Sequence, residues 1–176
     1  MNGEKRTFII QGEYHVSKDD SEVICTVLGS CVAVCLWDGM ARIGGMNHFL
    51  LPSGGAGSDD QRSMRYGVNA MERLINDLLK GGARRDRLQA KLFGGARIGA
   101  NLKDIGGSNA IFARDFLRTE DITLVAESLG GTSARRITFH PTTGKASQYL
   151  VPADPDTAPP PPRRPAAAQA PAITLF

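Results

Sequence analysis

This chain contains three cysteines and three histidines, whose side chains could attack a carbon atom or carry a proton. Cys31 starts the apolar run CVAVCLW, and His48 lies in the next apolar run, GGMNHFLLP. A thiol is nucleophilic as the thiolate, and an imidazole can take the thiol proton near neutral pH. The two residues are therefore candidates for a nucleophile and its general base.

The residues before Cys31 distinguish it from the other two cysteines. Gly29 permits a sharp backbone turn, and Ser30 is small and polar where a strand would carry bulk. Such a turn can present a thiol and align backbone N–H groups that stabilise an oxyanion. The alternative is that the cysteines are small buried hydrophobic residues, which we favour for Cys35 because apolar residues flank it.

The three histidines differ in their surroundings. A lone histidine in an apolar stretch is often a core residue with satisfied hydrogen bonds, so both interpretations of His48 remain open. His15 and His140 are weaker candidates for a base. His15 is far from the cysteine in sequence, and His140 precedes Pro141 in a predicted hairpin turn.

Spacing excludes several other sites. In an extended strand the Cα atoms of Cys31 and Cys35 lie about 13 Å apart, at about 3.3 Å per residue. A disulfide needs less than about 7 Å. The chain has no C-x-x-C pair, phosphate-binding loop or G-x-S-x-G motif. The sequence thus predicts no metal and no nucleotide cofactor.

Hydrophobic periodicity predicts a mixed α/β domain. The predicted strands span 6–10, 22–29, 31–37, 42–52, 88–95, 122–131, 134–140 and 145–152, and the predicted helices span 63–80 and 108–118. The second helix has an apolar stripe of Ile111, Phe112, Phe116 and Leu117. A hairpin of the strands at 31–37 and 42–52 would bring His48 back near Cys31.

The prolines mark the end of the domain. Eight of the ten prolines fall within 152–171, a composition that cannot build a core. We therefore predict one domain over residues 1–151 and an extended or disordered Pro/Ala-rich tail over 152–176. We favour a plain tail. The alternatives are that the apolar residues 173–176 dock on the protein, and that the tail is a ligand for a partner domain.

Composition limits the classes of function. A chain of 176 residues, 41% hydrophobic and 22% charged, is ordinary for one globular domain. The net charge of +3 is too small to indicate nucleic acid binding, and we interpret the arginine clusters at 84–87 and 135–136 as solvated surface. The sequence shows neither a long apolar run nor a signal peptide, which predicts a cytoplasmic protein with free thiols.

Several stretches together resemble one known family. They are TVLGSCVAVCLWD, IGGMNHFLLP, GEYHV, AKLFGGARI, IGGSNAIFARDFL and AESLGGTSARRITFHPTTGK. On these motifs residues 7–151 resemble the CheD family of chemoreceptor glutamine deamidases, and the Pro-rich tail lies outside the resemblance.

The resemblance implies a protein-glutamine glutaminase that converts glutamines of methyl-accepting chemotaxis receptors to glutamate through a thioester, without a cofactor. It implies that Cys31 is the nucleophile, His48 its base, and a nearby threonine the residue that orients the imidazole. The position six residues before the nucleophile is Cys25 here, and Thr26 follows it. We choose Thr26, although a shift of one residue in a strand reverses the face of the side chain.

The resemblance also implies a fold and partners. The expected fold is a three-layer α/β/β arrangement with mixed sheets, like the catalytic domain of cytotoxic necrotizing factor toxins. The expected partners are receptor cytoplasmic domains and a CheC-like phosphatase. Two alternatives for function are a non-catalytic module that regulates such a phosphatase, and a thiol hydrolase of another specificity, such as a receptor methylesterase or a protease.

Overall fold

The computed structural model describes residues 3–52, 58–99, 104–152 and 173–176. In these residues the strands form two five-stranded sheets, ordered β1-β3-β8-β9-β10 and β2-β5-β4-β6-β7. The elements are β1 (Lys5–Phe8), β2 (Tyr14–Ser17), β3 (Glu22–Leu28), β4 (Val32–Asp38), β5 (Ile43–Phe49), α1 (Ser58–Lys80), a 3₁₀ turn (Arg85–Arg87), β6 (Gln89–Gly94), α2 (Ile105–Thr119), β7 (Thr123–Leu129), β8 (Arg135–Phe139), β9 (Ala146–Leu150) and β10 (Ile173–Leu175).

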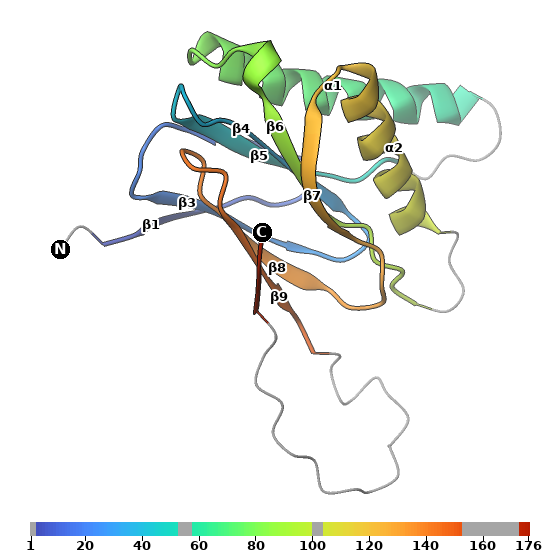
Figure 1. Ribbon diagram of the computed structural model, residues 1–176. Coiled ribbons are helices and arrows are strands. Elements are labelled where there is room, and N and C mark those ends of the chain that lie inside the picture. The colour runs from blue at the N-terminus through green and yellow to red at the C-terminus, as the bar shows by residue number, and fades with distance from the viewer. Residues whose placement is uncertain (1–2, 53–57, 100–103, 153–172) are drawn as a thin grey trace, which may run out of the picture.

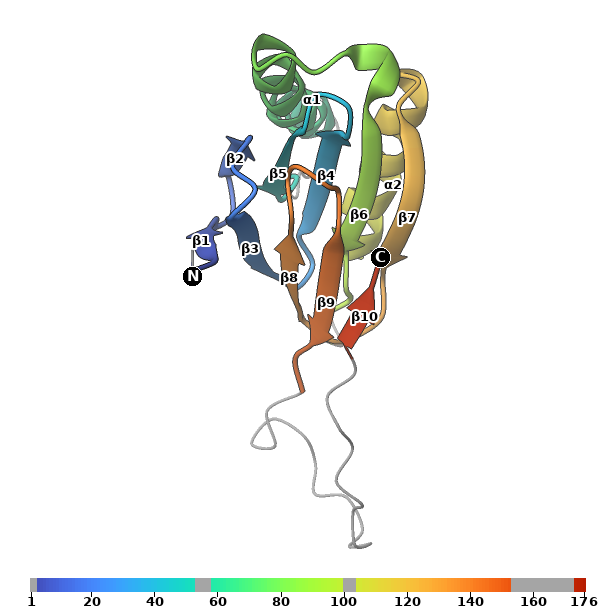
Figure 2. The same cartoon turned by 60° about the vertical axis from the view of Figure 1, so that its left-hand side comes forward.

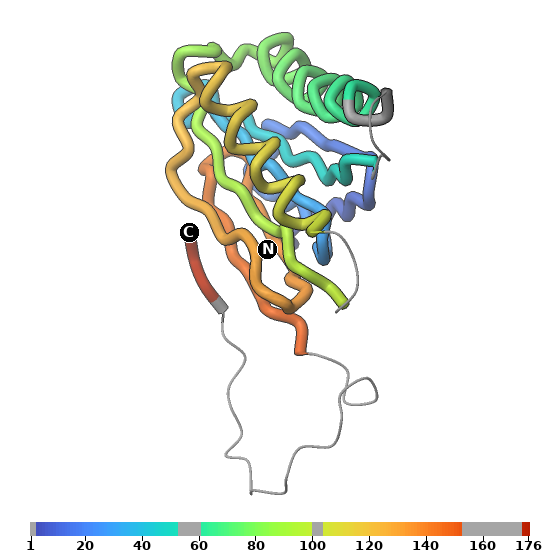
Figure 3. The backbone as a smooth tube through the Cα atoms, turned by 90° about the vertical axis from the view of Figure 1, so that its right-hand side faces the viewer, coloured from blue at the N-terminus to red at the C-terminus, as the bar shows by residue number. Residues whose placement is uncertain are grey.

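The elements stack in three layers. Helices α1 and α2 cover one face of the sheet that contains β4, and the sheet that contains β3 covers the other face (Figure 1 and Figure 3). Figure 2 shows the two sheets one behind the other, with β8 and β9 in front of β4 and β6. Both sheets are mixed, because β1 pairs with β3 and β6 with β7 in parallel, whereas the other pairs are antiparallel.

Strand β4 is the centre of the domain, and all seven of its residues are buried. Neighbouring side chains in a strand point to opposite faces, so each face of β4 contributes to a different core. Val32, Val34 and Leu36 pack in the cluster beneath the helices. Ala33, Cys35 and Trp37 pack in the cluster between the two sheets. The near-continuous apolar run of β4 reflects this burial on both faces.

The predicted hairpin of β4 and β5 is confirmed. The two strands pair antiparallel, with Ala33 opposite His48. The glycines of β5 allow close packing, because a Cβ at Gly45 would lie 2.7 Å from the carbonyl oxygen of His15 in β2. The hairpin therefore returns His48 to the end of β4 at which Cys31 lies.

The structure also corrects the sequence prediction. The predicted strands and helices are present, but α1 begins five residues earlier than expected and β2 was not predicted as a strand. Ile111 was expected on the apolar stripe of α2 and is instead 60% exposed. Phe112, Phe116 and Leu117 are buried as expected, because only their side of α2 faces the sheet. Among the described residues, neither helix is long and apolar enough to span a membrane.

The end of the chain differs from the plain tail that we favoured. Residues 153–172 lie outside the described part, but β10 pairs antiparallel with β9. Phe176 exchanges backbone hydrogen bonds with Ala146, and its ring packs edge-on against Phe93 with the centroids 5.1 Å apart. The preference for a plain tail is therefore wrong for these last residues, of which Phe176 packs against the core between the sheets.

We expect Phe176→Ala to destabilise the protein by about 1–2 kcal/mol, because it removes a half-buried ring and its contact with Phe93. Urea denaturation measures this change. Leu175→Ala is the matched control, since Leu175 is 78% exposed, and should change stability by less than about 0.5 kcal/mol. Equal effects of the two substitutions would contradict the anchoring role of Phe176.

Candidate active site

Cys31 lies in the turn between β3 and β4, and its thiol is half-buried at the edge of the inter-sheet core. Its Sγ atom lies 3.6 Å from the side-chain oxygen of Gln11. Burial raises the pKa of this thiol above its ordinary value, although the backbone N–H of Cys31 acts in the opposite direction. The thiol is therefore protonated at neutral pH, and needs a base to become a nucleophile.

The turn that carries Cys31 is held through its carbonyl groups. The carbonyl oxygen of Gly29 accepts from the N–H of Ala96 at 2.9 Å, and that of Cys31 accepts from Gly95 at 2.7 Å. The carbonyl oxygen of Ser30 accepts from the side-chain amide of Asn109 at 2.9 Å. Within the described residues, the N–H groups of Ser30 and Cys31 have no backbone acceptor.

The end of β6, which lies against the turn that carries Cys31, needs a glycine at position 94. Gly94 has a φ of 110°, and a Cβ there would lie 2.1 Å from the carbonyl oxygen of Cys31. A residue with a side chain would thus meet both a strained backbone and a steric clash. The sequence GGA at 94–96 therefore permits the close approach that holds the turn of residues 29–31, which carries Cys31.

His48 lies on β5 with its imidazole only 6% exposed. Its Nδ1 atom lies 2.8 Å from the hydroxyl oxygen of Thr26, which lies 2.8 Å from the carbonyl oxygen of Ile9. A carbonyl can only accept, and a hydroxyl has one proton to donate. The Thr26 hydroxyl therefore donates to Ile9 and accepts from Nδ1–H of His48, which leaves the Nε2 atom of the imidazole as the unprotonated nitrogen.

The Nε2 atom of His48 is ready to accept a proton. This atom is buried and has no hydrogen-bond partner among the described residues. Burial lowers the pKa of His48 to about 4, while the charge of Glu13 opposes that shift. The imidazole is therefore neutral at pH 7. A neutral histidine with a free lone pair is the form that a general base requires.

The structure brings the three predicted residues to one end of the inter-sheet layer. Ala33 is the partner of His48, and Cys31 lies two residues before it. In a regular antiparallel pair such diagonal positions are about 7–8 Å apart. Thr26 approaches His48 from the opposite sheet, so the site combines one residue from β3, one from β5 and one from the turn between β3 and β4.

The other cysteines do not face this site. Cys25 neighbours Thr26 in β3 and so points to the other face, where its sulfur lies 3.8 Å from the Thr138 hydroxyl. Of the two positions left open by the sequence, only Thr26 contacts His48. Cys35 is completely buried, which confirms it as a core residue, and burial raises the pKa of its thiol.

The other two histidines have other partners. The backbone N–H of His140 closes the β8–β9 hairpin by donating to the carbonyl oxygen of Lys145. The Nε2 atom of His15 lies 3.1 Å from the carboxylate of Glu22. Neither therefore replaces His48 as the candidate base.

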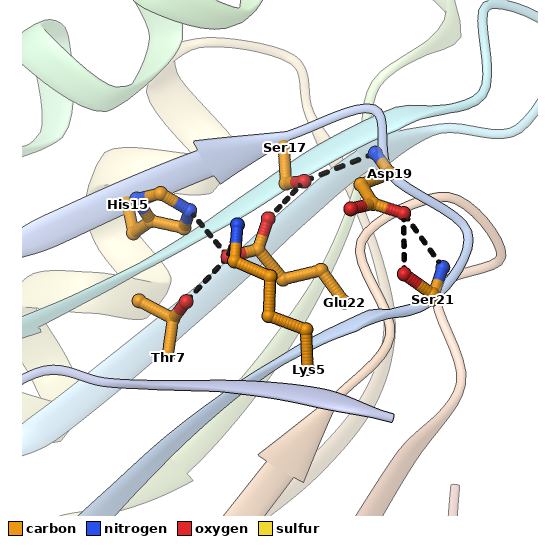
Figure 4. Close-up of polar contacts among 7 residues, drawn as sticks. All are labelled: Lys5, Thr7, His15, Ser17, Asp19, Ser21 and Glu22. Atoms are coloured by element: carbon orange, nitrogen blue, oxygen red, sulfur yellow. Dashed lines mark hydrogen bonds and ion pairs between the residues drawn. The ribbon is translucent and has the colours of Figure 1, made fainter. Parts of the chain in front are cut away.

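A second polar cluster, which the sequence pattern did not predict, joins β1, β2 and β3. Glu22 is 3% exposed, and its carboxylate contacts Lys5, Thr7, His15 and Ser17 (Figure 4). Burial alone would raise the pKa of Glu22, but hydrogen bonds from Ser17, Thr7 and Lys5 lower it to about 2. The only signal in the sequence is a charged residue at the head of an apolar strand.

Among the described residues, no group of three or more histidine, cysteine or acidic side chains is suited to hold a metal ion. What the described residues offer is a thiol, a neutral imidazole and backbone N–H groups. Such a thiol can attack a carbonyl carbon, such an imidazole can take the thiol proton, and such N–H groups can stabilise the oxyanion that forms.

Comparison with known proteins shows extensive similarity. Residues 50–148 match the family model described as CheD chemotactic sensory transduction. The chain is 52% identical to the probable chemoreceptor glutamine deamidase CheD of Caulobacter vibrioides, over 96% of this chain and 89% of that protein. The corresponding protein of Caulobacter sp. strain K31 is 54% identical over 94% of this chain and 87% of its own length.

The likeness to solved structures is slight. A Neisseria meningitidis protein of the DUF152 family has a TM-score of 0.44 at 14% identity, over 68% of this chain and 54% of that protein.

The pKa of His48 leads to a prediction about stability. The unfolded chain has an imidazole with an ordinary pKa of 6.5, whereas the native imidazole has a pKa of about 4. Between these values the unfolded chain binds a proton that the native protein does not. The free energy of unfolding should therefore fall, by on the order of 3 kcal/mol, as pH decreases through this window.

Urea denaturation across this pH range tests the prediction in the wild type and in His48→Gln. The variant should lose most of the slope, whereas His140→Gln should retain it. The lowered pKa of Glu22 affects stability mainly below about pH 5, so the slope between about pH 5 and pH 6.5 reports on His48. An unchanged slope in His48→Gln would show that another group is responsible.

Proposed function

Since the chain belongs to the CheD family, we propose that it is a protein-glutamine glutaminase that deamidates glutamines of methyl-accepting chemotaxis receptors. The observation that supports a cysteine mechanism most directly is the buried Nε2 atom of His48, which has no partner in the part of the chain that the structure describes. His48 lies on the strand paired with the one that follows Cys31. This nitrogen can take the proton of a thiol that burial keeps protonated at rest.

The proposed reaction has two halves. In the first, the Cys31 sulfur attacks the side-chain carbonyl carbon of glutamine while His48 takes the thiol proton. His48 then gives this proton to the leaving nitrogen, and ammonia departs from the tetrahedral intermediate, which leaves a thioester on Cys31. In the second half, His48 takes a proton from water, which attacks the thioester. The C–S bond then breaks, His48 returns its proton to the sulfur, and the new carboxylic acid loses its remaining proton to water to give glutamate.

Backbone groups of the nucleophile turn are suited to stabilise the tetrahedral intermediate. The carbonyls of Gly29 and Ser30 point to their hydrogen-bond donors. In a trans peptide the carbonyl and the N–H of the next residue point in opposite directions, so the N–H groups of Ser30 and Cys31 point away from those donors. The N–H groups of Ser30 and Cys31 are therefore our candidates for donors to the oxyanion.

Thr26 is a positioning residue in this proposal. Its hydroxyl already donates to the carbonyl of Ile9, so it can only accept from His48. This constraint keeps the proton on Nδ1 and the lone pair on Nε2. The same hydrogen bond stabilises the imidazolium that forms when His48 takes the thiol proton.

The proposal extends to the domain, its fold and its partners. We place the catalytic unit in residues 1–151 and the protein in the cytoplasm, where the signalling ends of receptors lie. Its partners in this proposal are the receptor cytoplasmic domains and a CheC-like phosphatase. The order of one helical and two sheet layers also supports a likeness to the catalytic domain of cytotoxic necrotizing factor toxins.

Mass spectrometry tests the activity and its nucleophile. We expect a receptor cytoplasmic fragment to gain about one dalton for each glutamine converted to glutamate. Cys31→Ser should abolish this gain, because a serine hydroxyl is a far weaker nucleophile in a site built for a thiol. Cys25→Ser makes the same chemical change on the other face of β3 and should retain activity.

Two outcomes would contradict the proposal. A mass gain that persists in folded Cys31→Ser would exclude Cys31 as the nucleophile. No gain with the wild type on several receptor fragments would favour the non-catalytic module that binds a phosphatase.

Substitutions of Thr26 test the positioning of His48. Thr26→Val removes the hydroxyl and should lower kcat by about 10–100-fold with little change in KM, because the imidazole loses its defined tautomer. Thr26→Ser keeps the hydroxyl and should retain most of the activity. Steady-state kinetics of ammonia release measure both effects. If valine and serine support equal rates, the hydroxyl does not position the base.

A further inference from the structure

Asn109 is a completely buried polar residue in helix α2. Asparagine is a poor residue for a helix interior, because it loses its alternative hydrogen bonds to the backbone there. Its complete burial adds a desolvation cost unless its amide is hydrogen bonded. A residue with these costs is expected to have a specific task.

Both ends of the Asn109 side chain are hydrogen bonded. Its Oδ1 atom accepts from the backbone N–H of Leu51 at 2.9 Å. Its Nδ2 atom donates to the carbonyl oxygen of Ser30 at 2.9 Å. Because one partner can only donate and the other can only accept, the orientation of the amide is fixed. Asn109 thus connects α2 both to the segment after β5 and to the nucleophile turn.

Helix α2 is pressed closely against the surroundings of that turn. A Cβ at Gly106, in the first turn of the helix, would lie 2.4 Å from the carbonyl oxygen of Gly95. The N–H of Gly95 in turn donates to the carbonyl oxygen of Cys31 at 2.7 Å. The helix is therefore a rigid support from which Asn109 reaches the peptide that precedes the nucleophile.

The hydrogen bond to Ser30 determines where the N–H of Cys31 points. The carbonyl of Ser30 and the N–H of Cys31 belong to the same peptide group, and no peptide bond among the described residues is cis. In a trans peptide these two groups point in opposite directions. The carbonyl points to Asn109, so the N–H of Cys31 points away from α2. This N–H and the thiol belong to the same residue, so the donor lies close to the sulfur that would attack the substrate carbonyl.

We propose that Asn109 is a positioning residue for the oxyanion site: by holding the Ser30 carbonyl, it directs the backbone N–H of Cys31 toward the oxygen of the tetrahedral intermediate. This proposal rests on the proposed deamidase function. Of the three turn carbonyls, those of Gly29 and Cys31 are held by backbone N–H groups. Only the Ser30 contact comes from a side chain, so a substitution can remove it alone.

Two substitutions separate this role from a general structural one. Asn109→Asp keeps an oxygen for the N–H of Leu51 but replaces the donor to Ser30 with an acceptor. Asn109→Leu has a similar size and removes both hydrogen bonds, so it serves if the buried carboxylate prevents folding. Asn76→Asp is the matched control, because it makes the same chemical change at an exposed position of α1.

The experiment compares two reactions of Cys31 in the same folded proteins. Deamidation of a receptor fragment forms an oxyanion, whereas alkylation of the thiol by iodoacetamide does not. We expect Asn109→Asp or Asn109→Leu to lower kcat for deamidation about 100-fold. The alkylation rate should change by less than about threefold, since the thiol and its base remain in place. Asn76→Asp should leave both rates unchanged.

Each other outcome overturns the proposal. Parallel losses in deamidation and alkylation would show that Asn109 maintains the whole turn and not the oxyanion site. Unchanged deamidation in both variants would show that the Ser30 contact has no catalytic effect. If the wild type itself lacks deamidase activity, the proposed function fails together with this inference. An active wild type with unaffected variants refutes the inference alone.

Discussion

The hydrogen bond between Thr26 and His48 is the interaction on which the candidate site depends. It crosses from one sheet to the other, so it exists only when the two sheets are packed face to face. The packing that brings the residues together also removes water from the imidazole and lowers the pKa of His48 to about 4. Position, tautomer and protonation state of the candidate base therefore have one common origin, the closure of the inter-sheet layer.

The nucleophile turn, residues 29–31, depends on a second constraint, which is that the residues packed against it include glycines without a Cβ. Three successive carbonyls are held by groups from two other parts of the chain. Those groups approach the turn closely only because Gly94 and Gly106 have no Cβ. The high glycine content thus serves the site directly, since a turn held at every peptide loses little further conformational entropy when substrate binds.

The sequence predicted the parts of this design that are local. Periodicity located the helices and the β4–β5 hairpin, and the hairpin alone places His48 near Cys31. Periodicity could not decide between Cys25 and Thr26, because the face that a strand presents is set by its packing against another sheet. Asn109 and Glu22 escaped detection for the same reason, since each owes its role to partners distant in sequence. The pairing of β10 with β9 depends on an edge that only the folded sheet creates.

The opposite pKa shifts of Cys31 and His48 determine the resting state of the site. Burial raises the pKa of the thiol and lowers that of the imidazole, so both groups are neutral at neutral pH. A thiolate–imidazolium pair would be the more nucleophilic resting state, but a thiolate is also the form that oxidants attack. In the proposed mechanism, the proton of such a neutral pair moves only when the sulfur attacks a bound carbonyl group and backbone N–H groups stabilise the oxygen of that group. In the proposed mechanism the reactivity of Cys31 therefore depends on the oxyanion donors as much as on the base, which is why the orientation of a single peptide group has so large an expected effect.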